Sequence, residues 1–231
     1  MNKLRNLSYL LVAFTLIFNA CSKDDDPVIP EDPNAIVSAR LDFIEVSGHA
    51  HGDHFHDLAE ITGEKDSVAI EFDQFGVAKS GHIHLDPHKV YRLQLYAYNR
   101  EGKEVQEEFL TSKTVADFYK AFIVGGNFTL NPETGEAENG ALFQPREQTY
   151  GDGTKVNGKY ETTGILAYFT LGEANEGADT DVSYVLRKLS DNTTKGKIER
   201  IDWNHDDYAS RFAGEDVLKL TFELHAVGHD H

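Results

Sequence analysis

The chain is poor in sulfur. Its 231 residues include one cysteine, Cys21, and one methionine, Met1. A single cysteine cannot form an intrachain disulfide or a thiolate zinc site, and a methionine-rich copper(I) site is also excluded. Because both sulfur-containing residues lie within the first 21 positions, a metal site in the rest of the chain must bind its ion through nitrogen and oxygen atoms. That donor set favours zinc, with copper(II), nickel and cobalt as alternatives.

The N-terminal apolar run is too short to span a membrane. It extends from Tyr9 to Phe18, whereas a helix needs roughly 20 apolar residues to cross a bilayer. Lys3 and Arg5 precede the run, and the small residue Ala20 follows it. This order of basic, apolar and small residues predicts a secretory signal peptide over residues 1–20, which is removed by cleavage.

The junction of Ala20 and Cys21 resembles a bacterial lipobox. The resemblance implies that Cys21 carries a lipid and becomes the mature N-terminus, which leaves no thiol for nucleophilic catalysis. The following Ser-Lys-Asp-Asp-Asp, residues 22–26, resembles the export signal of Bacteroidota-type surface lipoproteins. It implies display on the outer face of the outer membrane, where an uptake receptor is a candidate partner. A solvated spacer is the alternative explanation for this acidic run. Residues 21–35 are expected to form the lipid anchor and a flexible, proline-containing tether.

Basic residues are scarce. The formal net charge is −17, and removal of Lys3 and Arg5 with the signal peptide makes it −17 − 2 = −19 for the mature part. This charge argues against binding to nucleic acid or to anionic membrane surfaces, and it concentrates cations near the protein. Solubility of a secreted protein explains the same charge equally well.

Alternating apolar and polar residues predict β-strands through much of the remaining chain. Val68, Ile70 and Phe72 alternate with Ala69, Glu71 and Asp73, and residues 91–98 follow the same pattern. Further runs rich in branched and aromatic residues are 165–171, 182–186, 198–203 and 218–225. We expect an all-β fold, an antiparallel β-sandwich with one short helix. Residues 36–110 and 111–231 are its two regions, which form either one body or two.

The short helix is expected near residue 115. Val115, Phe118, Tyr119 and Phe122 have helical spacing, Thr114 and Asp117 offer a capping box, and Gly125-Gly126 would end the helix. A second helical turn is expected over residues 206–212. Residues 83–104 resemble the late hairpin of an immunoglobulin-like sandwich, which implies such a sandwich in the N-terminal half.

Histidine is abundant where sulfur is scarce. Ten of the eleven histidines lie in three tracts, and imidazole is the commonest protein ligand of transition metals. We predict a metal site formed from His49, His51, His54, His56, His82, His84 and His225. Asp53, Asp57, Asp86, His88, Glu223, His229 and His231 are candidates for further ligands or for acceptors of the free imidazole N–H.

Strand geometry supports this prediction. Successive side chains of a strand point to opposite faces, so His82 and His84 should point outward while Ile83 and Leu85 point to the core. One His-x-His pair supplies half of a tetrahedral zinc shell, and a second tract would supply the rest. The sequence around His49 resembles that around His225, because each follows a strand and precedes alanine. Pairing of those two strands would bring the two histidines together.

Three other classes of function compete with metal capture. A zinc enzyme is one, but no His-Glu-x-x-His, Gly-x-Ser-x-Gly or phosphate-binding loop is present. Gly48 to His51 and Gly81 to His84 are similar to the Gly-Phe-His-x-His copper strand of copper–zinc superoxide dismutases, a β-sandwich family whose other ligands and cysteines have no counterpart here.

The other two classes are a surface binding module and a haem protein. A surface module would bind a glycan or a protein partner of a nutrient-uptake system. Tyr96, Tyr98, Tyr150 and Tyr160 could form its aromatic platform. A haem protein would use histidine or tyrosine as axial ligand. Haem binding would give a coloured protein, which separates it from zinc.

Overall fold

The structure is a computed structural model that describes residues 35–228, and these belong to one compact unit. The predicted signal peptide, Cys21 and most of the tether lie outside the described residues, as do His229 and His231. Among residues 35–228, no helix combines the length and apolarity needed to cross a membrane.

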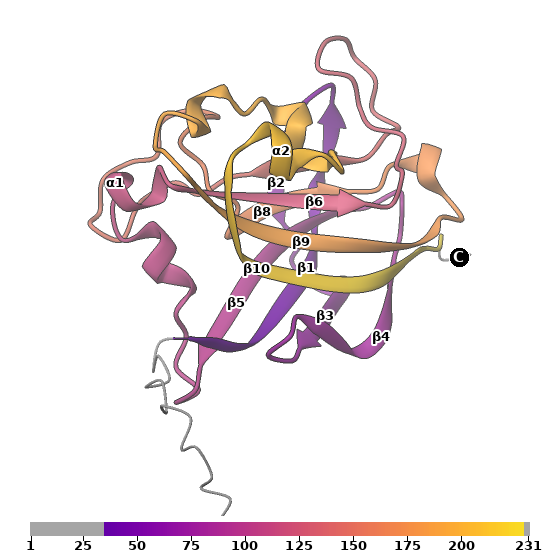
Figure 1. The fold of residues 1–231 in the computed structure, drawn as a ribbon. Helices are drawn as coiled ribbons and strands as arrows, with labels where there is room; N and C mark the ends of the chain where they lie inside the picture. Colours follow the sequence, from indigo (N-terminus) through magenta and orange to yellow (C-terminus); the bar gives the residue numbers. More distant parts are fainter. Residues whose placement is uncertain (1–34, 229–231) are drawn as a thin grey trace, which may run out of the picture. The chain divides into compact units, whose positions relative to one another are not determined.

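The fold is all-β, as the sequence predicted (Figure 1). The strands are β1 Ile36–His51, β2 His54–Glu60, β3 Ser67–Phe72, β4 Val77–Leu85, β5 Val90–Asn99, β6 Tyr119–Gly125, β7 Leu142–Pro145, β8 Leu166–Thr170, β9 Asp179–Leu189 and β10 Gly214–Ala226. The helices are short: η1 Gln106–Leu110, α1 Lys113–Ala116, η2 Glu173–Asn175, η3 Lys195–Lys197, η4 Arg200–Asn204 and α2 Tyr208–Arg211.

All ten strands belong to one hydrogen-bonded sheet. Its order is β6-β9-β10-β4-β3-β1-β5-β8-β7, and β2 pairs with β1 off this path. Every pair is antiparallel except β10 and β4, which run parallel. Strands from both sides of residue 110 are interleaved, because β10 pairs with β4 and β8 pairs with β5.

The two ends of the sheet enclose a common core. The ring of Phe43 on β1 contacts those of Phe169 on β8 and Phe222 on β10, with centroids 6.2 and 6.3 Å apart. Figure 1 shows β6, β9 and β10 crossing β1 and β5. Apolar side chains alternate inward along β5 and β10, so the opposite faces of these strands are free for polar residues.

The expected helix near residue 115 is wrong over most of its length. Ser112, not Thr114, caps a single turn, α1, and residues 119–125 form β6. β6 pairs with β9 from Tyr119 opposite Lys188 to Gly125 opposite Val182. Residues 120–124 are all buried, so both faces of β6 contact protein. A strand buried on both faces shows no alternation, which explains the misassignment.

The strand expected at residues 198–203 is also wrong. This stretch enters the 3-10 helix η4, where the side chains of Glu199 and Asp202 form a capping box. The amide of Asn204 at its end donates to the carbonyls of Ile123 and Gly125 on β6. The helical turn expected at residues 206–212 is present as α2.

The stretch that resembles an immunoglobulin hairpin, residues 83–104, ends in a turn after β5 that is followed by only a single bridging residue. Asn99 accepts backbone hydrogen bonds from Glu101 and Lys103 through its side chain, and a single bridge joins Tyr98 to Glu104 before η1 begins. The suggested pairing of the strands that end at His49 and His225 does not occur. β1 and β10 are separated in the sheet by β3 and β4.

Candidate metal centre

Three neighbouring strands present a polar row on the outer face of the sheet. In the parallel pair, His225 of β10 lies opposite His84 of β4, and Glu223 lies opposite His82. On the other side of β10, His225 lies opposite Asp179 of β9. The intervening side chains Ile83, Leu85, Leu224 and Ala226 are buried. Strand alternation therefore places the polar side chains together while the apolar ones anchor the strands in the core.

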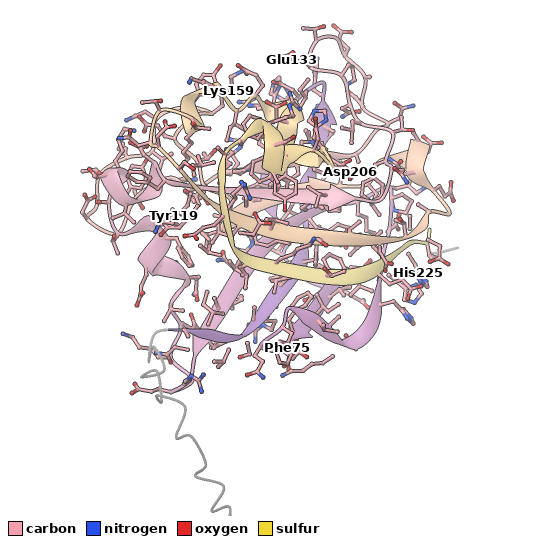
Figure 2. All side chains as sticks on the ribbon, in the orientation of Figure 1. Phe75, Tyr119, Glu133, Lys159, Asp206 and His225 are labelled. Carbon is pink, nitrogen blue, oxygen red and sulfur yellow. The ribbon has the colours of Figure 1, made fainter. Side chains whose placement is uncertain are left out.

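The three imidazoles of this row contact one another. The rings of His82 and His225 are stacked with centroids 4.6 Å apart and planes within 4°. The ring of His84 lies edge-on to both, with its centroid 5.0 Å from each. Figure 2 labels His225 at the end of β10. We call these three histidines, together with Glu223 and Asp179, the β4–β10 site.

Two carboxylates flank the third imidazole. Nε2 of His225 lies 3.1 Å from Oε1 of Glu223 and 3.2 Å from Oδ1 of Asp179. The Nε2 atom is buried, and neither oxygen has the alignment of a hydrogen bond to it. The neighbouring His225 is the largest of the effects that lower the pKa of Glu223. The Glu223 carboxyl group is therefore ionised at neutral pH.

The donor atoms of this site are grouped closely enough to be candidate ligands of a divalent cation. Those of His82, His84 and His225 all lie within 4.8 Å of one another, and so do those of Asp179, Glu223 and His225. A tetrahedral zinc ion with bonds of about 2.1 Å requires neighbouring donor atoms about 3.4 Å apart. His82 and His84 are exposed, so modest side-chain rotations can close the difference. With a cation bound, the buried Nε2 of His225 would either coordinate the ion through its lone pair or donate its N–H to a carboxylate while Nδ1 coordinates.

Four further tract histidines form a separate cluster on the β1–β2 hairpin. His49 lies opposite His56 and His51 opposite His54, while Ala50 and Phe55 point to a small core on the other face. The closest rings, those of His54 and His56, have centroids 4.5 Å apart. We call His49, His51, His54 and His56 the histidine hairpin.

The histidine hairpin lacks a converged ligand set. Within residues 35–228, donor atoms of three or more side chains gather within 4.8 Å only at the β4–β10 site. Nδ1 of His54 is 2.9 Å from Oδ1 of Asp53, which also pairs with Arg200 at 3.1 Å. Asp57 is exposed and lies 4.0 Å from His49. Desolvation, together with the three neighbouring histidines, lowers the pKa of His56.

The remaining candidates lie apart from the β4–β10 ligands. Asp86 is buried and its carboxylate accepts the backbone N–H of His88, so it belongs to the turn after β4. His88 is exposed, 4.0 Å from Glu176. His205 follows η4 as expected of a turn residue, with Nε2 3.6 Å from Asp202. Tyr150 is buried, which removes it from the suggested aromatic platform.

Asp179 is a member of the β4–β10 site that the sequence did not reveal. It begins β9 and lies opposite His225 only because β9 and β10 pair in this register. Acidic residues are too common in this chain for one more to stand out. Knowledge of the β9–β10 register would have been the only useful signal.

Comparison of the chain with protein-family models, with curated proteins and with solved structures finds no match.

Proposed function

We propose that this protein is a surface-anchored lipoprotein that captures a divalent transition metal, preferably zinc, at the β4–β10 site. The observation that carries the proposal is the convergence of the donor atoms of three imidazoles, from strands far apart in sequence, one of which, His225, also lies beside two carboxylates. Nitrogen and oxygen donors in this number suit zinc, and copper(II), nickel and cobalt are its competitors.

The exposure of the site favours acquisition or buffering over a structural role. His82 and His84 are open to solvent, so a bound ion can exchange with the medium or pass to an uptake receptor. A structural zinc site is usually closed by four protein ligands. The net negative charge of the chain raises the local concentration of cations around the exposed β4–β10 site.

Calorimetric titration with zinc tests the proposed site. The purified protein and all variants carry His229→Ala and His231→Ala, so that the C-terminal histidines do not add to the signal. We expect submicromolar binding of one ion at the β4–β10 site. The His82→Ala, His84→Ala variant should bind at least about a hundredfold more weakly, because two of three imidazoles are lost.

The matched control is His49→Ala, His51→Ala, which removes an equivalent His-x-His pair from the histidine hairpin. Its zinc affinity should stay within about threefold of the parent. Equal losses in both variants, or only weak and fractional binding by the parent, would reduce the histidines to nonspecific chelation. That result would favour the surface binding module instead.

The proposed anchor has its own test. Metabolic labelling with a radioactive fatty acid should label the protein, and Cys21→Ser should abolish the label. Protease treatment of intact cells should then digest the labelled protein if it faces the exterior. A label that survives Cys21→Ser, or complete protection from protease, contradicts the lipid anchor or the surface location respectively.

A further inference from the structure

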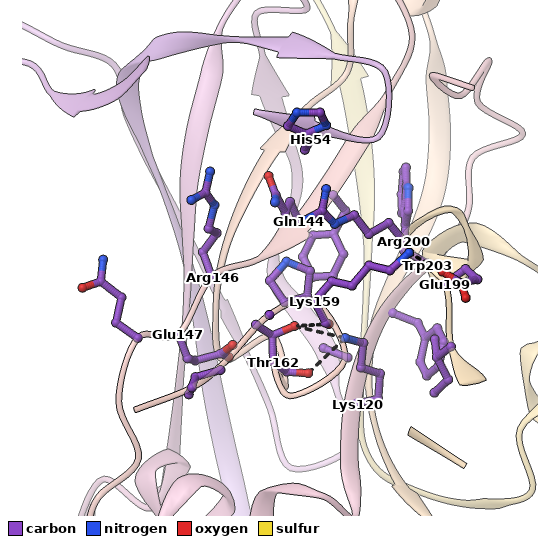
Figure 3. A pocket seen from close by; sticks show the side chains of 18 residues that line it. His54, Lys120, Gln144, Arg146, Glu147, Lys159, Thr162, Glu199, Arg200 and Trp203 are labelled. Carbon is purple, nitrogen blue, oxygen red and sulfur yellow. Dashed lines mark hydrogen bonds and ion pairs between the residues drawn. The ribbon is translucent and has the colours of Figure 1, made fainter. Parts of the chain in front are cut away.

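A cavity lies away from the β4–β10 ligands. It has a volume of about 330 Å³ and is bounded by β6, β7, η4 and the segment around residues 156–162 (Figure 3). Its apolar walls include Phe122, Phe143 and Trp203, and its polar walls include four basic side chains. This volume lies within the usual range for pockets that hold small organic ligands.

The charge of this cavity is opposite to that of the chain. The whole sequence has 22 basic and 39 acidic residues, yet Lys120, Arg146, Lys159 and Arg200 line the cavity beside only two carboxylates, Glu147 and Glu199. Figure 3 shows the four basic side chains entering from different segments. A local excess of positive charge against an acidic background requires a specific cause.

Both carboxylates already accept hydrogen bonds from neighbouring protein groups. Glu147 is buried and accepts backbone N–H groups of Thr163 and Gly164 at 3.1 and 2.5 Å. Glu199 pairs with Lys159 and accepts the hydroxyl hydrogen of Tyr160. These bonds hold the two anions at the edge of the cavity and do not neutralise all of its cations.

Two cations of the cavity have no carboxylate partner. Among the described residues, none lies within 4.0 Å of the Lys120 ammonium or the Arg146 guanidinium, although Lys159 and Arg200 are paired. Arg146 donates to the carbonyl of Phe55. Lys120 donates to the carbonyl and hydroxyl oxygens of Thr162, which accounts for two of its three N–H donors.

Lys120 is the more unusual of the two, because it is only 7% exposed. Desolvation lowers its pKa to about 8, with Glu147 acting to raise it and Arg200 to lower it. The group is therefore still mostly protonated at neutral pH. A buried ammonium without a counter-ion is destabilising, and an anion entering the cavity would supply the missing partner.

We propose that this cavity binds a small organic anion, a carboxylate carried on an aryl or alkyl body. Lys120 and Arg146 supply the unpaired positive charge that attracts the carboxylate, and the body packs against Phe143 and Trp203. The proposal is independent of metal capture, because it uses none of the β4–β10 ligands.

Trp203 provides the measurement. It is the only tryptophan of the chain and it lines the cavity, so its fluorescence reports occupancy. The protein is titrated with phenylbutyrate, with the neutral phenylbutyramide and with the cationic phenylbutylamine, in chelator and again with zinc. We expect saturable binding of the acid, at least tenfold weaker binding of the amide, none of the amine, and no effect of zinc.

Variants locate the binding groups. Arg146→Gln and Lys120→Met should each weaken phenylbutyrate binding at least tenfold, whereas Lys103→Gln in the turn after β5 should not change it. Thermal unfolding is measured in parallel, and if Lys120→Met does not fold, Arg146→Gln decides. Equal affinity for acid and amide overturns anion recognition. A titration without saturation for all three compounds overturns the ligand cavity, and full binding by folded Arg146→Gln overturns the assigned head-group site.

Discussion

The β4–β10 site and the histidine hairpin contain similar residues in different geometries. The hairpin has more imidazoles, but two antiparallel strands place them in opposed, largely stacked pairs with separate acidic neighbours. At the β4–β10 site, β4 supplies two imidazoles, β10 one imidazole and one carboxylate, and β9 one carboxylate, and their donor atoms form two close groups that share His225. Strand register, and not the number of histidines, determines which cluster brings its donor atoms together.

Acidification should separate the two clusters most strongly. Imidazole binds metal only when neutral, and its ordinary pKa is about 6.5, so each histidine ligand costs about tenfold in affinity one pH unit below that value. Glu223 adds nothing in this range, because its lowered pKa keeps it ionised. Zinc affinity of the three-histidine site should fall about a thousandfold between pH 7.5 and 5.5.

Competition calorimetry at several pH values measures this fall. Two histidine ligands, as a pair on the histidine hairpin would supply, give only about a hundredfold over the same interval. A pH-independent affinity would exclude histidine ligation at either cluster.

Removal of His225 should have the next largest effect. This side chain belongs to both groups of donor atoms at the β4–β10 site. His225→Ala should therefore weaken zinc binding about a hundredfold, or about 2.7 kcal/mol. His88→Ala, which removes an exposed histidine beside β4, is the control and should bind like the parent. If the two variants behave alike in a calorimetric titration, His225 is not a ligand.

Glu223→Gln should have a smaller effect that tests the role of the carboxylate. The amide keeps the shape but loses the charge beside Nε2 of His225. Loss of a carboxylate that orients a ligating imidazole typically costs roughly ten- to a hundredfold in metal affinity, and we expect the lower end because Asp179 remains. The exposed Glu215→Gln at the other end of β10 is the control. Unchanged zinc affinity in Glu223→Gln would remove Glu223 from the site.

The smallest expected effect is that of pH on the stability of the histidine hairpin in the absence of metal. The pKa of His56 is lower than its ordinary value, so the unfolded hairpin binds more protons and the folded hairpin loses stability as pH falls through about 6.5. Hydrogen-exchange protection of the β1–β2 amides should fall slightly from pH 7.5 to 5.5, relative to β9–β10 amides. His56→Ala should lessen this difference, and an unchanged profile in that variant would contradict the explanation.

The alternation of side chains along one strand was enough to predict the part of the β4–β10 site that belongs to β4. His82 and His84 point outward and Ile83 inward because side-chain direction in a strand depends only on neighbouring residues. The partner strand of β4 could not be predicted in this way. Similarity of sequence suggested that β1 would meet β10, but strand order depends on the packing of the whole core.

The missed elements share a physical reason. β6 is buried on both faces and η4 is fixed by contacts to β6, so tertiary contacts override the local pattern in each case. The basic cavity gave no signal for the same reason. Three of its basic residues lie far apart from one another in the sequence: Lys120, Arg146 and Arg200. They line one cavity only when β6, β7 and η4 have packed.

The parallel pairing of β10 with β4 also determines when the three histidines come together. The third imidazole belongs to the last strand, 225 − 84 = 141 positions after its neighbour. A growing chain carries His82 and His84 without His225, so under the proposed function it would bind metal more weakly than the folded protein. Once β10 has paired with β4, an ion bound by histidines of both strands would stabilise that pairing reversibly. The availability of metal would then affect how long β10 stays paired with β4.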